Sequence, residues 1–214
     1  MNYPETMSKR SVALLIFTKS PVEGHVKTRL IPQWGSHGAL LLYQDMIKAT
    51  IEMTQRSSIE DIIIYRTPGD DSPFLQSCSI HYELPLMEQC GPDLGDRMHN
   101  AIHEHLKTHE CVIIIGCDCP ELSEEELHKT IKGLNTEADI VLGPCEDGGY
   151  YLMGMKQEHP ELFSGIDWGT SDVMEQTRKR INSLGLSSCE LDIKWDVDRP
   201  EDVFRYMSRL QHEG

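Results

Sequence analysis

The stretch Cys111–Leu122, CVIIIGCDCPEL, decides the fold class of this chain. Its first half is a run of apolar, mostly branched residues that is long enough for a buried strand and too short for a helix. Asp118 comes directly after this run, where the chain leaves the strand and turns. Ser123 and Glu126 follow with the spacing of a capping box, and the glutamates of this first turn suit the positive end of a helix dipole. The stretch therefore predicts a buried strand, an acidic turn, and a helix that begins at Ser123.

The same alternation of strand and helix patterns runs through the rest of the chain. Continuous apolar runs predict strands, and apolar residues at intervals of three and four predict helices. Besides the unit above, strands are expected at 12–17, 61–66, 80–84, 139–142, 150–155 and 189–193, and helices at 38–55, 96–108, 170–182 (capped by Thr170 or Ser171) and 200–210. Strands that alternate with helices predict an α/β fold with a mostly parallel sheet and helices on both faces. We expect one domain over residues 12–214, preceded by a flexible N-terminal tail over residues 1–11.

The composition excludes several classes of protein. The chain has 214 residues, with 20 Lys and Arg against 35 Asp and Glu, and a formal net charge of −15. Because nucleic-acid-binding proteins usually carry a basic patch, we expect no nucleic acid partner. No apolar run approaches the roughly 20 residues that span a bilayer, so we expect no membrane partner and a cytoplasmic location. The seven cysteines contain no CxxC pair, which argues against a structural zinc site and favours free thiols, Cys117 and Cys119 included.

The residues that follow the first predicted strand favour phosphate binding. In a parallel sheet, ligands bind at the carboxyl ends of the strands. The loop after Phe17 contains Lys19, Gly24, Lys27 and Arg29. Cationic side chains and backbone amides at this place would cradle a phosphate chain, although the loop lacks the glycine spacing of a P-loop and of a dinucleotide-binding loop. An ordinary solvated loop is the alternative that these residues leave open.

Acidic residues after other predicted strands suggest a metal site. Asp118 follows the strand at 111–116, and Asp196 and Asp198 follow the last strand. Asp196 and Asp198 alternate, so in an extended segment they point to the same side. Three carboxylates at one edge of a sheet would offer the oxygen ligands that Mg²⁺ prefers. For Asp198, the N-cap of the final helix is an equally open alternative.

A third acidic segment contains Asp147, Gly148 and Gly149. The glycines would allow a ligand to approach the backbone closely, and the carboxylate of Asp147 could bind a hydroxyl group or a metal. Asp-Gly is also a strong signal for a hairpin turn, and the two interpretations are compatible.

Two pairs of histidines show the spacing of metal ligands on a helix. His99 and His103 are four residues apart, and so are His105 and His109. No HExxH motif accompanies either pair, so we interpret them as the titrating surface of a helix rather than a catalytic metal site.

Six motifs together carry a resemblance to a known family. They are Phe17–Leu30 (FTKSPVEGHVKTRL), Gly91–Met98 (GPDLGDRM), Ile115–Leu122 (IGCDCPEL), Leu142–Leu152 (LGPCEDGGYYL), Trp168–Val173 (WGTSDV) and Asp196–Val203 (DVDRPEDV). With these motifs, the chain resembles the DUF2064 family of the nucleotide-diphospho-sugar transferases over about residues 12–207. It is more distantly similar to phospholactate guanylyltransferases and to molybdenum-cofactor nucleotidyltransferases.

The resemblance implies a single-domain, Rossmann-like GT-A fold, a bound nucleotide and a divalent metal, Mg²⁺ or Mn²⁺. The metal ligands that it implies are Asp118, Asp196 and Asp198. Residues assigned to nucleotide binding are Lys19, Gly24, Lys27, Arg29, Gly95 and Arg97. Residues assigned to substrate binding are Asp147, Gly148, Gly149, Thr170 and Ser171. Catalytic roles fall to Lys27 and Arg29, which would stabilise the charge of the leaving group, and to Asp147 as a candidate base.

The expected activity is a metal-dependent transfer reaction on a nucleotide. GT-A glycosyltransferases usually carry Asp-x-Asp after the central strand, whereas this chain has a single acid there, in Asp118-Cys119-Pro120. This difference favours nucleotidyl transfer from a nucleoside triphosphate to a small anionic acceptor. The alternatives are a glycosyltransferase with a nucleotide-sugar donor and a non-catalytic nucleotide-binding module. The sequence does not show which base, sugar or acceptor is used, and it does not show the oligomeric state.

Overall fold

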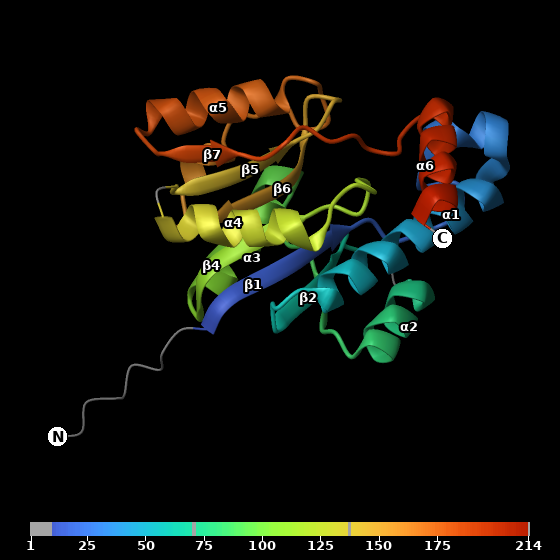
Figure 1. The fold of residues 1–214 in the computed structure, drawn as a ribbon, viewed down its shortest axis with the longest axis horizontal. Helices are drawn as coiled ribbons and strands as arrows, with labels where there is room; N and C mark the ends of the chain where they lie inside the picture. Colours follow the sequence, from blue (N-terminus) through green and yellow to red (C-terminus); the bar gives the residue numbers. More distant parts are fainter. Residues whose placement is uncertain (1–9, 70–71, 137, 214) are drawn as a thin grey trace.

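Seven strands form one sheet in the order β3-β2-β1-β4-β6-β5-β7 (Figure 1). This computed structural model describes residues 10–69, 72–136 and 138–213. The strands are β1 (Arg10–Thr18), β2 (Asp61–Arg66), β3 (Leu86–Glu88), β4 (His109–Ile115), β5 (Ile140–Pro144), β6 (Tyr150–Met155) and β7 (Ser188–Glu190). All neighbouring pairs are parallel except the two that involve β6, which runs against β4 and β5. The sheet is thus mostly parallel, as predicted.

Helices cover both faces of the sheet. They are α1 (Ile31–Arg56), α2 (Pro73–Tyr82), α3 (Leu94–Leu106), α4 (Glu124–Thr136), α5 (Val173–Ser183) and α6 (Pro200–Glu213), with short 3₁₀ turns η1 (Thr28–Leu30) and η2 (Pro160–Leu162). Alternate residues of β1 point to opposite faces. Leu14 packs in one core with residues of α1, α2 and α4, and Leu15 packs in a second core with residues of α3 and α5.

Helix α6 packs against helix α1 rather than directly on the sheet. Figure 1 shows it beside the first half of α1, at the side of the molecule where the strands β1 and β4 end. Val203 and Tyr206 of α6 pack there against Ala39 and Met46 of α1 in a third apolar cluster, together with Trp195. This cluster holds the segment before α6 against the carboxyl edge of the sheet. None of the described helices has the length and apolar character needed to cross a bilayer.

One half of the capping box that the sequence predicted at the start of α4 is present, namely the bond from the Ser123 N–H to the Glu126 carboxylate. The backbone N–H and the hydroxyl of Ser123 both donate to Oε2 of Glu126, at 3.1 Å and 2.5 Å. Burial alone would raise the pKa of Glu126, but the bonds from Ser123 and the nearby ammonium of Lys194 hold that pKa below its usual value. The charged carboxylate therefore fixes the loop between β4 and α4, which contains Asp118.

Several predicted element boundaries are wrong, for local reasons. Residues 80–82 of the expected third strand belong to α2, which Ser72 caps by accepting a hydrogen bond from the Leu75 N–H; the short strand β3 begins only at Leu86. Ile80 had suggested a strand, yet its side chain is 79% exposed on the helix. The tail was expected to end at residue 11, but β1 begins at Arg10; residues 1–9 lie outside the described part of the chain.

Two helices also begin elsewhere than predicted. Helix α1 starts at Ile31, seven residues before the expected start at residue 38. The helix is kinked at Gly35. Helix α5 starts at Val173, because the hydroxyl of Thr170 donates to the Asp167 carbonyl at 2.8 Å and belongs to the preceding turn. The cap expected from Thr170 or Ser171 is therefore wrong, since Asp172 occupies the N-cap position.

Candidate active site at the carboxyl edge of the sheet

The loop after β1 is anchored on helix α1 through Tyr43. The backbone N–H of Lys19 donates to the Tyr43 hydroxyl at 3.0 Å, and the Thr18 hydroxyl lies 3.0 Å from the same oxygen. Burial, together with the nearby charge of Asp118, raises the pKa of Tyr43 well above its usual value, so this hydroxyl keeps its proton. The backbone at Lys19 is thereby fixed, while its side chain is exposed.

Lys27 turns inward at the end of this loop. Its backbone is left-handed (φ 48°), a conformation that non-glycine residues rarely adopt and that often marks functional sites. Its ammonium Nζ donates to Oδ1 of Asp118 at 2.6 Å and to the carbonyl oxygen of Val197 at 2.5 Å, and it lies 5.5 Å from the centre of the Tyr43 ring. The side chain is only 5% exposed. Because a buried ammonium needs a charged partner, Lys27 and Asp118 depend on one another.

A second ion pair joins Arg29 to Asp198. The guanidinium of Arg29 donates to Oδ2 of Asp198, and both side chains are largely exposed. The backbone N–H groups of Asp198 and Arg199 donate to Oδ2 of Asp202, at 3.0 Å and 2.7 Å. The carboxylate of Asp198 is therefore turned toward Arg29, while Asp202 accepts the hydrogen bonds at the start of α6.

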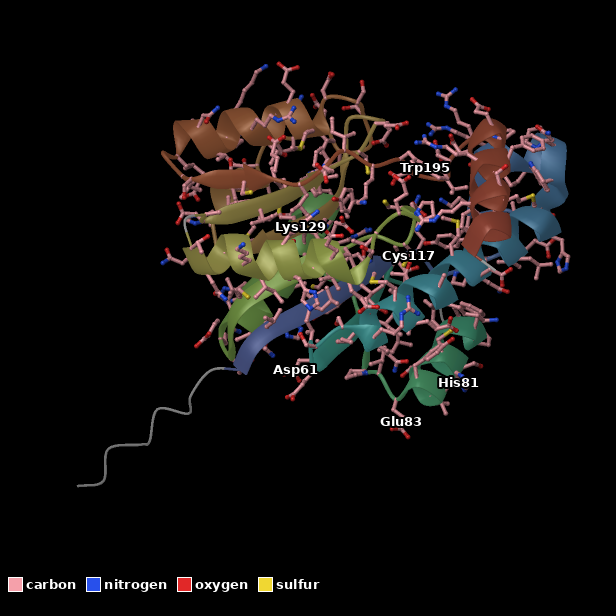
Figure 2. All side chains as sticks on the ribbon, viewed as in Figure 1. Asp61, His81, Glu83, Cys117, Lys129 and Trp195 are labelled. Atoms are coloured by element: carbon pink, nitrogen blue, oxygen red, sulfur yellow. The ribbon has the colours of Figure 1, made fainter. Side chains whose placement is uncertain are left out.

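The two ion pairs bring three distant segments together. The Val197 N–H donates to the carbonyl oxygen of Asp118 at 2.9 Å, which fixes the segment before α6 against the loop after β4. Figure 2 shows Cys117 and Trp195, the chain neighbours of Asp118 and Asp196, both in the region between the sheet and α6. Cations of the first loop thus meet acids of the two later segments at one edge of the sheet.

Asp196 lies in a more enclosed environment. The thiol of Cys145 donates to its Oδ1 at 3.2 Å, and single ligand atoms of Cys145, Asp147 and Asp196 all lie within 4.8 Å of one another. Burial, followed by the charge of Asp118, raises the pKa of Asp196 to about 7. Burial and the neighbouring Asp196 also raise the pKa of the Cys145 thiol far above its usual value, so the thiol stays protonated.

The predicted metal ligands have suitable donor atoms for a divalent cation, but the structure does not bring all three together. Among the described residues, the group whose ligand atoms all lie within 4.8 Å of one another is Cys145, Asp147 and Asp196. Asp118, Asp196 and Asp198 provide carboxylate oxygens, the donors that Mg²⁺ and Mn²⁺ prefer, and the side chain of Asp118 is 50% exposed. Burial and, after it, the charge of Asp118 raise the pKa of Asp196, and a bound cation would offset both effects. In the structure, however, each acid has a different partner, and two of the three are neutralised by Lys27 and Arg29.

The hairpin predicted around Asp147 is confirmed as the connection of β5 and β6. The Cys145 N–H donates to the Gly149 carbonyl at 3.0 Å, and the Gly149 N–H donates to Oδ1 of Asp147 at 2.8 Å. Gly148 has φ +89°, and a Cβ on it would lie 2.0 Å from the Ser171 carbonyl oxygen. The close approach at Gly148 is thus made by the turn before α5, and a substrate contact of these residues stays a prediction.

Two of the other residues assigned to the nucleotide lie at the start of α3. Gly95 is buried at the start of α3, where a Cβ would lie 2.6 Å from Nε1 of Trp168. The Arg97 Nε donates to the Gly91 carbonyl at 2.9 Å. Within the described residues, no hydrogen bond or ion pair joins the acids to Lys19, Gly24, Gly95 or Arg97.

Sequence reasoning missed two residues of this site. Cys145 stands inside a recognised motif, but the sequence analysis expected only a free thiol there and gave it no role in the site. Tyr43 occupies an apolar position of the predicted helix, and a periodicity pattern cannot show which partner a hydroxyl group finds. The cysteines are free thiols as predicted, and burial raises the pKa of Cys117 and of Cys119 to about 12, which makes both unreactive.

The nearest described cavity does not contain these charged groups. It measures about 290 Å³ and lies between α1, the loop after β4 and α6, with Thr50, Cys117, Cys119 and Tyr206 among its lining residues. None of the residues assigned to metal, nucleotide or substrate lines it.

Comparison with solved structures shows which proteins share this fold. A "putative nucleotide-diphospho-sugar transferase" from Desulfovibrio desulfuricans G20 is 30% identical, with a TM-score of 0.82 over 89% of this chain and 83% of that chain. CMP:2-keto-3-deoxy-manno-octonic acid synthetase complexed with CTP is 10% identical (TM-score 0.63; 95% and 100% covered). Glucosyl-3-phosphoglycerate synthase from Mycobacterium tuberculosis, in complex with Mn²⁺, UDP and glucosyl-3-phosphoglycerate, is 12% identical (TM-score 0.56; 94% and 76% covered). The last two share the fold alone.

Comparison of the sequence with known proteins finds one family. No curated protein sequence matches the chain significantly. Residues 50–170, more than half of the chain, match a family described as "Uncharacterized protein conserved in bacteria (DUF2064)". The fold is that of nucleotidyl- and glycosyltransferases, and the chain belongs to the DUF2064 family.

Proposed function

We propose that this protein is a Mg²⁺- or Mn²⁺-dependent nucleotidyltransferase that transfers a nucleotide from a nucleoside triphosphate to a small anionic acceptor. One observation carries the proposal: Lys27 pairs with Asp118 while Arg29 pairs with Asp198. Two cations suited to phosphate and two acids suited to a metal meet at the carboxyl edge of the sheet, where α/β proteins bind nucleotides. The strongly acidic surface is compatible with anionic substrates, because a metal and local cations can neutralise them.

The pairs suggest how the residues act when a nucleotide binds. Lys27 and Arg29 would exchange carboxylate for phosphate oxygens, and would then stabilise the charge that develops on the leaving pyrophosphate. Asp118 and Asp198, released from those cations, would hold the divalent metal together with Asp196, whose present partner is the thiol of Cys145. When bound, the metal would neutralise the phosphates and polarise the phosphorus that the acceptor attacks. The left-handed backbone of Lys27 and the anchor at Tyr43 hold the ammonium in place for this exchange.

The remaining assigned residues would surround the nucleotide. Gly24 has φ +80° with open space around its Cα, and the neighbouring Lys19 side chain is exposed, so both are free to meet a ligand. Arg97 extends from the start of α3, and Gly95 allows Trp168 to pack closely beside it. We propose that Lys19 and Arg97 add positive charge along the nucleotide, and that Gly95 acts by shaping this surface.

Glycosyl transfer is the second candidate, and Asp147 favours it. Its exposed carboxylate lies beside Asp196, at the tip of the β5–β6 hairpin, next to Gly148, Gly149, Thr170 and Ser171. A carboxylate at the edge of a metal and phosphate site could accept the proton of a sugar acceptor. The similarity to a described nucleotide-diphospho-sugar transferase also supports this candidate.

A ligand screen separates the two reactions. Thermal unfolding would be followed with each common nucleoside triphosphate and with nucleotide-sugars, in Mg²⁺, in Mn²⁺ and in chelator. Saturating ligand stabilises the folded protein, by about 2.7 kcal/mol at 100 times the dissociation constant. Nucleotidyl transfer predicts that a triphosphate gives the largest metal-dependent shift, whereas a larger shift with a nucleotide-sugar would favour glycosyl transfer. No metal-dependent shift with either class would overturn the proposal.

A further inference from the structure

A buried thiol and two carboxylates converge at the β5–β6 hairpin. Single ligand atoms of Cys145, Asp147 and Asp196 all lie within 4.8 Å of one another. The thiol is the most enclosed of the three groups: Cys145 is 6% exposed, and its Sγ donates to Oδ1 of Asp196 at 3.2 Å. Asp147 is exposed, so solvent can reach the group from that side. The proposed transfer reaction gives Cys145 no part in binding or catalysis.

The backbone holds the three residues in these positions. Cys145 and Asp147 belong to the hairpin, where the Gly149 N–H donates to Oδ1 of Asp147 at 2.8 Å. The segment before α6 brings Asp196 to them, because Lys194 forms an isolated parallel bridge with Cys145. Two segments that are 51 positions apart in the chain are therefore fixed side by side before any ligand binds.

The ion pairs of this region leave the group without a cation. Lys27 and Arg29 pair with other acids. Within the described residues, neither Asp147 nor Asp196 forms an ion pair; the bonds that these carboxylates accept come from a backbone N–H and from the thiol. Like charges that lie this close repel one another, and a bound cation removes the repulsion. The group thus has the donor atoms of a metal site and no internal cation in place of the metal.

We infer that Cys145, Asp147 and Asp196 form a binding site for Zn²⁺. Both thiolates and carboxylates bind Zn²⁺, at about 2.3 Å for sulfur and about 2.0–2.2 Å for oxygen. In tetrahedral geometry a sulfur and an oxygen ligand then lie about 3.5 Å apart, close to the 3.2 Å between Cys145 Sγ and Asp196 Oδ1. Two oxygen ligands lie about 3.4 Å apart, so the limit of 4.8 Å leaves at most about 1.4 Å for the exposed side chain of Asp147 to close.

The thiol decides which metal fits. Thiolate ligands select Zn²⁺ over Mg²⁺, which prefers oxygen ligands. Cys145 would bind as the thiolate and release its proton to solvent, because the charge of a coordinated ion deprotonates a thiol. Three protein ligands leave a fourth position, which water can fill.

The site shares one residue with the ligand set proposed for Mg²⁺. Zn²⁺ bound here would take Asp196 from that ion, and would join the β5–β6 hairpin to the segment before α6. Only this competition rests on the proposed function. The site itself depends on the three side chains, whether or not the protein transfers nucleotides.

The test is Zn²⁺ binding to the full chain without nucleotide, measured by competition with a zinc-sensitive dye in excess Mg²⁺ and a thiol-free reductant. The variants are Cys145→Ala and Asp147→Asn; the asparagine keeps an oxygen that can accept the bond from the Gly149 N–H. The matched controls are Glu146→Gln, an exposed acid between the two ligands in the chain, and Cys189→Ser, an exposed thiol outside the group. Co²⁺ in place of Zn²⁺ provides a second measurement, because thiolate ligation gives a strong near-ultraviolet absorption band.

We expect the wild type and both controls to bind one Zn²⁺ and to show the Co²⁺ band. Cys145→Ala should lose the band and bind Zn²⁺ at least about tenfold more weakly, since even loss of an outer-shell partner costs 10–100-fold. Asp147→Asn should weaken binding by a similar factor and keep the band at saturating Co²⁺. If Cys145→Ala does not fold, Asp147→Asn decides, because its side chain is exposed.

Three results would overturn the site: a wild type that binds no Zn²⁺, a Co²⁺ spectrum without the thiolate band, or Zn²⁺ binding that is as tight in Asp147→Asn or Cys145→Ala as in the wild type. Failure of the proposed function is a separate result. It would appear as a lack of metal-dependent nucleotide binding, which this measurement does not involve.

Discussion

The ammonium nitrogen of Lys27 lies 2.6 Å from Oδ1 of Asp118, although 91 positions separate the two residues in the chain. The first follows β1 and the second follows β4, and these neighbouring parallel strands end at the same edge of the sheet. The contact therefore results from the topology of the fold, and it places the cation that we propose for phosphate binding beside the acid that we propose for metal binding. Asp118 is half exposed while Lys27 is almost completely buried, so a ligand can reach the acid from solvent.

Replacing the two cations should separate a structural from a binding contribution. Lys27→Ala should lower the free energy of unfolding by about 1–3 kcal/mol, because it removes a buried charged hydrogen-bond donor. Arg29→Ala should change it by less than about 1 kcal/mol, because Arg29 is 65% exposed. The burial of Lys27 therefore gives its side chain a structural contribution that Arg29 lacks. Both variants should bind triphosphate more weakly by about 1.5–3 kcal/mol, as measured by calorimetry on the folded fraction; unchanged affinity in both would contradict the phosphate assignment.

The two glycines of the β5–β6 hairpin should respond differently to a methyl group. Gly148→Ala is expected to lower the melting temperature clearly, since its Cβ would lie 2.0 Å from the Ser171 carbonyl oxygen and its φ is +89°. Gly149→Ala is the matched control, because its Cβ would approach only the movable Asp147 carboxylate, at 3.2 Å. Thermal unfolding of both variants gives the comparison. Equal melting temperatures would show that the turn before α5 does not restrict Gly148.

The stability of the metal-free protein should depend on Asp196 and on pH. The pKa of the Asp196 carboxyl is raised to about 7 in the folded state, against about 3.9 for an ordinary Asp. At pH values between these two, the folded state therefore binds more protons than the unfolded state. The free energy of unfolding should therefore fall as pH rises from about 4 to about 7, by at most about 4 kcal/mol from this group. The free energy of unfolding of Asp196→Asn should not fall in this pH range, so this variant should be more stable than the wild type at pH 8.

Urea unfolding in chelator at pH 4.5 and pH 8 measures this difference, with Asp192→Asn as the control for an exposed acid of the same segment. Adding Mg²⁺ at pH 8 should restore stability to the wild type and not to Asp196→Asn. A wild type that is as stable at pH 8 as Asp196→Asn would show that the carboxylate is not destabilised by its surroundings.

The sequence predicted those features of the fold that depend on local pattern. The strand Asp61–Arg66 was predicted with its observed bounds, because its apolar run is continuous and buried on both faces. The capping box of Ser123 and Glu126 was predicted from two residues, since its hydrogen bonds are local. The third strand was expected at residues 80–84 but lies at Leu86–Glu88. The apolar side chain of Ile80 had suggested a buried strand, but it is exposed on helix α2.

The candidate site was predictable in its residues but not in its pairing. The rule that ligands bind at the carboxyl ends of strands identified Lys27, Arg29, Asp118 and Asp198 from their positions in the chain. Which cation meets which acid depends on the left-handed turn at Lys27 and on the path of the segment before α6, neither of which leaves a periodic signal. The thiol of Cys145 was missed for the same reason, because its contact with Asp196 joins two loops.

The most direct test of the proposed function is the metal dependence of nucleotide binding, in the wild type and in Asp118→Asn. The asparagine keeps an oxygen that can accept the hydrogen bond of Lys27, but it removes the charge that a metal needs and that the buried ammonium pairs with. Unfolding in chelator is therefore measured for both proteins, and affinities are compared on the folded fraction. Calorimetric titration with the preferred triphosphate should show affinity at least about tenfold higher in Mg²⁺ than in chelator for the wild type, a difference of about 1.4 kcal/mol, and no such difference for Asp118→Asn. Equal affinity with and without Mg²⁺ in the wild type, or a metal effect that survives in Asp118→Asn, would contradict the assignment of this site.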